Sequence, residues 1–172
     1  MSKDPVAPIT SIAIIGNNIY AATLDNGVYF STDTGANWTD ISSGLPFGNT
    51  NCLAVHGNTV FAGTSATQVF TLPKNGIRWM AVGSDLEGSV IFLAVNGDTI
   101  FAGTYVRLFL SADNGASWTE DDSGLTDYSV LSFAAKGGAI FIGTRAMEKY
   151  HLLCYHPEIN GATSQTGYSP RP

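Results

Sequence analysis

The sequence predicts an all-β protein made of about four repeats, each an antiparallel meander of four short strands. A box of the form Ser-x-Asp-x-Gly-x-x-Trp occurs at 31–38 and again, 80 positions later, at 111–118. A strand-like segment of the type Phe-Ala-Gly-Thr recurs from residues 20, 61, 101 and 141, in steps of 41, 40 and 40. Composition agrees, since 19 glycines and frequent Thr, Val, Ile, Phe and Tyr suit short strands joined by tight turns. Repetition at one period indicates a repeat architecture.

The strands of each repeat follow from apolar runs and turn signals. Apolar runs that end in a turn open the repeats at 12–16, 53–57, 93–97 and 131–137. The pairs Asn17-Asn18, Asn26-Gly27 and Gly57-Asn58 favour hairpins, because these residues accept positive φ. We expect strands at 11–15, 18–23, 28–31 and 37–41 in the first repeat, and at 90–96, 99–104, 107–111 and 117–120 in the third. The repeats then divide at about 11–50, 51–89, 90–129 and 130–163, between an N-terminal lead (1–10) and a polar tail (164–172).

Two copies of the box are eroded. Residues 72–79 keep only the glycine and the tryptophan, Gly76 and Trp79. After Thr144 the fourth repeat loses both the apolar-strand pattern and the box, apart from a late echo at 160–163. We therefore expect the last repeat to be degenerate.

Stacking of the repeats decides the architecture. One meander of about forty residues cannot bury both faces, and radial stacking of such sheets gives a β-propeller. Small residues in the second strands, such as Ala62, Ala102 and Gly103, suit close packing of adjacent sheets. Three forms stay open: a fragment of a larger propeller, a compact four-bladed ring, and a half-propeller completed by a second copy. An open end exposes sheet edge and apolar surface, so we expect self-association there.

The two intact boxes resemble Asp-box (BNR) repeats, which occur in sialidases, sortilin-type receptor domains, some glucan hydrolases and photosystem II assembly factors. The resemblance covers about residues 11 to 144. It implies that the box occupies the turn between the third and fourth strands, that its aspartate accepts backbone N–H bonds there, and that its tryptophan packs between sheets. Asp, Gly and Trp suit these roles. We interpret the boxes as structural rather than catalytic or calcium-binding; their residues are Ser31, Asp33, Gly35, Trp38, Gly76, Trp79, Ser111, Asp113, Gly115 and Trp118.

The opposite edge of the repeats is the predicted binding surface. In a four-stranded meander, the turns between strands two and three and the crossovers to the next repeat meet there. These loops vary most between repeats, and variable loops on a rigid scaffold commonly bind ligands. We expect the turns at 24–26, 65–68, 105–106 and 145–149, and the crossovers at 44–51, 84–89 and 123–129. The candidate binding residues are Phe47, Asp85, Glu87, Tyr105, Arg107, Asp127, Tyr128 and Arg145.

Composition excludes several partners. A net charge of −6 argues against a nucleic-acid surface, which needs a basic stripe. No apolar run is as long as a membrane span, and the first residues lack the apolar core of a secretory signal. The compartment stays open, since the resemblance allows secreted or periplasmic proteins. We expect no cofactor and no metal: the spacing in the cluster Glu148, His151, Cys154, His156 and Glu158 is unfamiliar for zinc, and strand alternation would split it.

An enzyme needs more than the sequence offers. A sialidase-like site needs three arginines, a Tyr/Glu nucleophile pair and an acidic Asp, yet only Arg107 and Arg145 fall on the loop edge. A glucan hydrolase needs two carboxylates across a cleft, and no pair among Asp85, Glu87 and Asp127 is marked out. We therefore predict a non-catalytic binding or assembly scaffold for a protein or carbohydrate partner. The alternative is a fragment or divergent member of a sialidase-like or glucan-hydrolase glycoside hydrolase.

Overall fold

The computed structural model describes residues 5, 7–74, 76–83, 86–120, 129–136, 139–146, 149–156 and 161–168. Within these residues sixteen strands form four four-stranded antiparallel sheets, and no helix occurs. We call the sheets blades 1 to 4, in chain order. The all-β prediction is confirmed, and the fold is a partial β-propeller.

Each blade is a simple meander whose strands pair in chain order. Blade 1 holds β1 (Ile9–Ile15), β2 (Asn18–Thr23), β3 (Val28–Ser31) and β4 (Thr39–Asp40). Blade 2 holds β5 (Thr50–His56), β6 (Thr59–Thr64), β7 (Val69–Pro73) and β8 (Met80–Val82). Blade 3 holds β9 (Val90–Asn96), β10 (Thr99–Thr104), β11 (Leu108–Ser111) and β12 (Thr119–Glu120). Blade 4 holds β13 (Ser129–Lys136), β14 (Ala139–Ala146), β15 (Lys149–His156) and β16 (Gly161–Tyr168).

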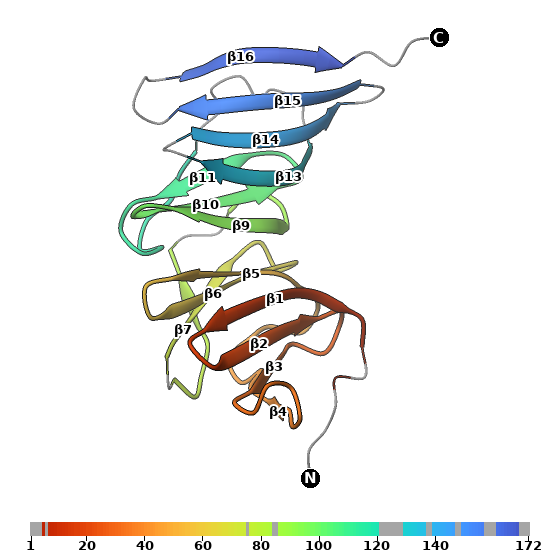
Figure 1. The fold of residues 1–172 in the computed structure, drawn as a ribbon, viewed down its shortest axis with the longest axis vertical. Helices are drawn as coiled ribbons and strands as arrows, with labels where there is room; N and C mark the ends of the chain where they lie inside the picture. Colours follow the sequence, from red (N-terminus) through yellow and green to blue (C-terminus); the bar gives the residue numbers. More distant parts are fainter. Residues whose placement is uncertain are drawn as a thin grey trace.

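The blades stack through their first strands. Strand β1 contacts β5, β5 contacts β9, and β9 contacts β13. Figure 1 shows the four sheets following one another along the long axis, with blade 1 at the bottom and blade 4 at the top. The first and last blades therefore lie at opposite ends of an open arc.

The core lies between consecutive blades. Alternation along each strand sends one set of side chains to the preceding blade and the other to the following blade. Tyr20 and Leu53 meet between blades 1 and 2, and Phe61 and Val90 meet between blades 2 and 3. Phe101 packs between blades 3 and 4. Large side chains from both sheets thus fill each boundary.

Small residues in the second strands allow this close approach. Ala62 and Ala102 are fully buried. A Cβ added at Gly63 would lie 2.5 Å from Val90 Cγ1 of blade 3, and one added at Gly103 would collide with the ring of Phe92, its partner in the same blade. The predicted role of these residues in packing agrees with their surroundings.

The fourth strand of a blade is shorter than predicted. The sequence suggested strands at 37–41 and 117–120, whereas β4 and β12 contain only two residues each. The amides of Asn37 and Ser117 donate to the carboxylates of Asp33 and Asp113 in the preceding turns. These amides therefore cannot also pair with a neighbouring strand.

Blade 4 is a more regular sheet than its sequence predicts. Its strands β15 and β16 form a complete sheet, although the apolar pattern is lost after Thr144. Residues 164–168 belong to β16 rather than to a tail, and Arg145, Ala146 and Lys149 lie in strands rather than in a turn at 145–149. The reason is that strand pairing is made by backbone groups, and an edge strand such as β16 tolerates polar side chains.

Candidate functional site

The loops at one edge of blades 1 to 3 are joined by hydrogen bonds. The amide of Asp25, in the β2–β3 turn, donates to Asn49 Oδ1 at 3.2 Å. The amide of Ser65, in the next blade's β6–β7 turn, donates to the carbonyl oxygen of Asn49 at 3.1 Å. The amide of Leu86, in the following crossover, donates to the carbonyl oxygen of Thr67 at 2.8 Å. The turns and crossovers thus form one continuous surface, which we call the loop edge.

Large apolar side chains project from the loop edge. Phe47, in the first crossover, is fully exposed. Tyr105, in the β10–β11 turn, is 59% exposed, and its neighbour Val106 is 48% exposed. Leu24, in the β2–β3 turn, is also exposed. Two of the predicted binding residues, Phe47 and Tyr105, are therefore exposed at the loop edge.

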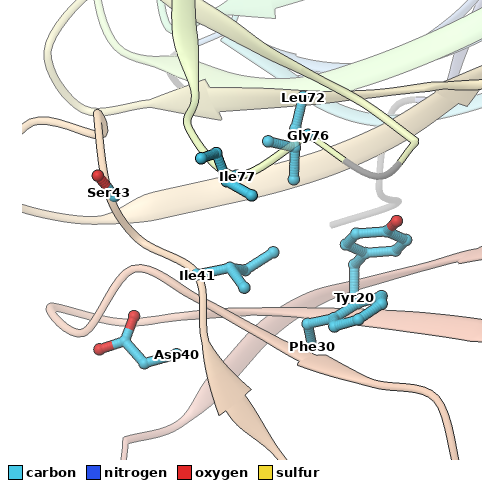
Figure 2. Close-up of a pocket in the computed structure, with 8 residues that line it drawn as sticks. All are labelled: Tyr20, Phe30, Asp40, Ile41, Ser43, Leu72, Gly76 and Ile77. Atoms are coloured by element: carbon cyan, nitrogen blue, oxygen red, sulfur yellow. The ribbon is translucent and has the colours of Figure 1, made fainter.

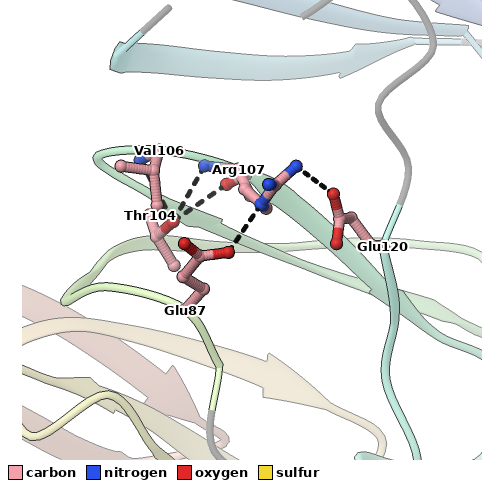
Figure 3. Close-up of polar contacts among 5 residues, drawn as sticks. All are labelled: Glu87, Thr104, Val106, Arg107 and Glu120. Carbon is pink, nitrogen blue, oxygen red and sulfur yellow. Dashed lines mark hydrogen bonds and ion pairs between the residues drawn. The ribbon is translucent and has the colours of Figure 1, made fainter. Parts of the chain in front are cut away.

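A charged cluster lies at the end of the β10–β11 turn, the turn that carries Tyr105 (Figure 3). The Nε of Arg107 donates to Glu87 Oε2 at 2.7 Å, and its Nη1 pairs with Glu120 Oε1. The Arg107 amide donates to Thr104 Oγ1 at 2.9 Å, and that hydroxyl donates to the Arg107 carbonyl at 3.2 Å. One guanidinium is therefore held between two carboxylates from different segments.

The structure brings some predicted residues together and adds one. Glu87 and Arg107 form an ion pair as described above. Glu120 is not among the predicted binding residues. Strand register could have indicated its contact with Arg107, because Glu120 pairs with Phe109, two residues from Arg107. Diagonal neighbours of this kind are within reach of long side chains. Arg145 lies in β14, where its backbone pairs with Ser129 and Tyr150. Its side chain, and residues Asp85, Asp127 and Tyr128, lie outside what the structure describes.

The first box is closed by its own hydrogen bonds. Asp33 Oδ1 accepts from the amide of Asn37 at 2.9 Å and from the hydroxyl of Ser31 at 2.9 Å. Asp33 Oδ2 accepts from the side-chain amide of Asn37 at 2.7 Å. The amide of Gly35 donates to Ser31 Oγ at 2.9 Å, and Thr34 and Gly35 have φ of 60° and 88°. The glycine supports this turn because it adopts positive φ without strain.

The second intact box repeats this geometry. Asp113 Oδ1 accepts from the amide of Ser117 at 2.8 Å and from the hydroxyl of Ser111 at 2.8 Å. The Ser117 hydroxyl donates to Asp113 Oδ2 at 2.5 Å. Bonds from the Ser117 hydroxyl and amide lower the pKa of Asp113 to about 2, and bonds from Asn37 likewise lower the pKa of Asp33. Both carboxylates are therefore ionised, and they accept hydrogen bonds from groups inside their own turns.

Each box tryptophan in blades 2 and 3 packs against the preceding blade. Trp79 is buried, and its Nε1 donates to the carbonyl oxygen of Ile41 at 2.9 Å. Trp118 lies over Gly83 of blade 2, where a Cβ would approach the indole to 2.5 Å. The buried indole N–H of Trp118 has no hydrogen-bond partner among the described residues. Trp38, in blade 1, is only partly buried.

A pocket opens beside the eroded box, between blades 1 and 2 (Figure 2). Its volume is about 390 Å³, and its walls include Tyr20 and Phe30 from blade 1 and Leu72 and Ile77 from blade 2. The sequence predicts binding only on the opposite edge, so these residues are absent from the predicted site. The erosion of the box at 72–79 is the sequence feature that marks the pocket.

The part of the chain that the structure describes holds no group of three His, Cys, Asp or Glu side chains that could bind a metal. The side chains of the cluster from Glu148 to Glu158 lie outside it. No described helix is long and apolar enough to cross a membrane.

Comparison with known proteins shows the fold alone. No family model matches the sequence, and no curated protein matches it. A GH74 enzyme from Niastella koreensis is 20% identical, with a TM-score of 0.70 over 94% of this chain and 25% of that one. YCF48 bound to D1 peptide is 14% identical, with a TM-score of 0.68 over 92% of this chain and 53% of that one. The WD40 β-propeller domain of Doa1 is 12% identical, with a TM-score of 0.72 over 95% of this chain and 55% of that one.

The chain thus spans between 25% and 55% of the lengths of these three proteins. Their shared architecture agrees with the four radial sheets described above. In fold, this chain belongs with the β-propellers.

Proposed function

We propose that this chain is a non-catalytic binding scaffold that presents its loop edge to an extended protein segment. The observation that carries the proposal is the full exposure of Phe47 on a hydrogen-bonded loop edge that also displays Tyr105. Exposed aromatic side chains are favoured anchors in protein recognition, and rigid support lowers the entropic cost of binding. Phe47 lies in the crossover from blade 1 to blade 2 and Tyr105 in the β10–β11 turn of blade 3, which suits a partner that crosses blade 2.

The charged cluster favours binding over catalysis. Glu87 and Glu120 both pair with the same guanidinium, that of Arg107. A glycoside hydrolase needs two carboxylates in contrasting environments, one of them protonated as the acid. Two glutamates that share one arginine instead form a polar rim at the β10–β11 turn, which also carries Tyr105.

One structural neighbour supports a protein partner. YCF48 is a propeller solved with a bound D1 peptide. The GH74 neighbour keeps the glycoside hydrolase reading as the alternative. Because all three neighbours are under 25% identical to this chain, their ligands suggest experiments but do not assign a partner.

We also propose that the boxes at 31–38 and 111–118 are Asp-boxes of the BNR type. The repeated pattern of serine, aspartate and amide bonds supports this assignment. The boxes carry no chemistry of their own, since both aspartates accept hydrogen bonds inside their turns. The boxes therefore belong to the scaffold, and the loop edge to recognition.

We also propose a second partner, another copy of the same chain, which associates through the outer face of blade 1. Ile12 and Ile14 on this face are 60% and 59% exposed. The residue equivalent to Ile12 is Leu53 in blade 2 and Leu93 in blade 3, and both are buried against the preceding blade. A blade from a second copy would cover Ile12 as the chain's own blades cover Leu53 and Leu93. Sedimentation of the wild type and of Ile12→Lys tests this; a concentration-independent monomer in both contradicts it.

The binding proposal is tested with immobilised peptide and glycan libraries. We expect selective binding to extended peptides, weakened at least tenfold in Phe47→Ala and in Tyr105→Ala, since anchor residues contribute about 2 kcal/mol or more. Met80→Ala is the matched control, because Met80 is also an exposed apolar residue but lies in β8. Hydrolysis of chromogenic glycosides, lost in Asp85→Ala or Asp127→Ala, would instead establish the hydrolase alternative.

A further inference from the structure

We propose that the pocket between blades 1 and 2 binds a small aromatic molecule that carries one hydroxyl or amine group. This site is separate from the loop edge and does not depend on the function proposed for it. Its residues come from β2, β3, the segment after β4, and the eroded box of blade 2. Three features of the pocket support this proposal: the reason that it is open, the chemistry of its walls, and its volume.

The pocket exists because the box of blade 2 is eroded. In the intact box of blade 3, Gly115 packs against blade 2: an added Cβ would lie 3.0 Å from Val82 Cγ2 and 3.4 Å from Phe61 Cε1. The equivalent glycine of blade 2 is Gly76, and the three atoms nearest to its added Cβ all belong to Leu72 and Pro73 of its own segment. The eroded box therefore does not fill the space beside blade 1 as the intact box fills the space beside blade 2.

The first residue of the box contributes to the same change. Ser31 pairs with Ile19, Ser111 with Ile100, and Leu72 with Val60, so the three residues are equivalent in register. Both serines accept the amide of their box glycine, at 2.9 and 2.8 Å. A leucine accepts no hydrogen bond, so it cannot hold the turn in that form. Its side chain instead supplies an apolar wall to the pocket.

The walls combine an apolar surface with one polar group, the hydroxyl of Tyr20. Tyr20 is only 2% exposed, and its ring packs against Phe30 with centroids 5.0 Å apart. Figure 2 shows the ring and hydroxyl of Tyr20 turned toward the blade 2 segment that carries Leu72 and Gly76. A tyrosine hydroxyl both donates and accepts hydrogen bonds, so it can contact a ligand hydroxyl or amine.

The size of the pocket limits the ligand. Its volume of about 390 Å³ is near the lower end of ligand sites, which suits a molecule of one or two rings. Asp40 borders the pocket, but its carboxylate accepts the amide and hydroxyl of Ser42, at 2.8 and 2.6 Å, on the face of blade 1 opposite to Tyr20 and Phe30. Apolar and aromatic walls, the Tyr20 hydroxyl and this volume together favour a phenol- or arylamine-type ligand.

The test is a titration of the whole chain with tyramine, toluene and benzoate, followed by backbone amide NMR shifts. We expect saturable tyramine binding in the millimolar range, with shifts at Ser43 and Ile77. Toluene, which lacks the polar groups, should bind about fivefold more weakly, the ratio expected for one neutral hydrogen bond. Benzoate should bind more weakly than tyramine, because its carboxylate would lose hydration in a pocket whose described lining residues include no cation.

Two variants locate the site and one serves as control. Tyr20→Phe removes only the hydroxyl, so it should lower the preference for tyramine over toluene while leaving toluene affinity unchanged. Ser43→Phe fills the mouth from an exposed position and should weaken tyramine and toluene together at least tenfold. Met80→Ala, at an exposed position in β8 that does not line the pocket, should change neither. The proposal is overturned if no ligand saturates, if Ser43→Phe binds normally, or if the preference survives in folded Tyr20→Phe.

Discussion

The indole Nε1 of Trp79 donates a hydrogen bond across the blade boundary to the carbonyl oxygen of Ile41, 2.9 Å away. A second bond runs beside it, from the backbone amide of Trp79 to the carbonyl oxygen of Ser43, also at 2.9 Å. The eroded box of blade 2 lacks the serine and aspartate that bond the intact boxes internally, but it is attached to blade 1 by these two bonds. Trp118 packs at the next boundary without an equivalent indole bond among the described residues.

This difference predicts unequal effects of matched substitutions. Trp79→Phe removes a buried hydrogen bond as well as packing, whereas Trp118→Phe removes packing alone. We expect Trp79→Phe to lower the free energy of unfolding by about 1 kcal/mol more than Trp118→Phe. Chemical denaturation of both variants measures the difference. Equal losses would show that the indole bond to Ile41 contributes nothing net.

The box carboxylates predict a loss of stability in acid. The folded-state pKa of Asp113 is lowered from 3.8 to about 2, chiefly by the Ser117 hydroxyl. A depressed folded pKa means that the stabilisation is present above the unfolded pKa, and it is lost as the pH falls from 3.8 toward 2. Asp113→Asn should therefore show a shallower decline of Tm over this range than the wild type.

The control for that experiment is Asp25→Asn, because Asp25 is exposed and asparagine also tolerates its φ of 66°. This variant should follow the wild-type curve. If the Asp113→Asn and wild-type curves are parallel, the box carboxylate does not contribute to the acid transition.

Burial predicts an inert thiol at Cys52. Burial raises the pKa of this thiol to about 12, and the bond with the backbone of Gly63 offsets this only in part. Because the thiolate is the reactive form, Cys52 should resist an aromatic disulfide reagent in the folded protein at neutral pH. The rate is measured in a Cys154→Ser background and should rise to that of a free thiol in denaturant. Fast labelling without denaturant would mean that the boundary between blades 2 and 3 opens readily.

The Arg107 cluster predicts a separation of stability from binding. Its three side chains are partly or largely exposed, and exposed ion pairs contribute about 1 kcal/mol or less. We expect Arg107→Ala to change the free energy of unfolding by no more than about 1 kcal/mol. The same variant should weaken binding of a peptide selected on the loop edge and reduce the salt dependence of that binding. A large loss of stability with unchanged binding would assign the cluster to the scaffold.

Much of the fold could be predicted from local patterns. The period of about forty residues and the alternation of apolar residues place β2, β3 and β10 as they are observed. Strand bounds near the boxes were less accurate, because the side chains of Asp33 and Asp113 capture amides that the alternation pattern assigns to strands. Blade 4 was underestimated for a related reason: backbone pairing holds β16 without an apolar pattern.

The candidate sites were predicted only in part. Phe47 and Tyr105 could be placed on the loop edge by strand phase alone, and both prove to be exposed. The contact of Glu120 with Arg107 depends on which residues face each other across β11 and β12. The pocket could not be predicted from the sequence, because it forms where the segment around Gly76 does not fill the space beside blade 1.

The sequence by itself determined the repeat, the meander within it and the edge on which the variable loops gather. These features depend on interactions between residues close in the chain, which leave a periodic pattern. Only the tertiary structure decided which faces are covered, where Trp79 finds its acceptor, and that the eroded box leaves a pocket beside Tyr20. Those outcomes depend on contacts between residues about forty to sixty positions apart, and packing of that range leaves no local signature.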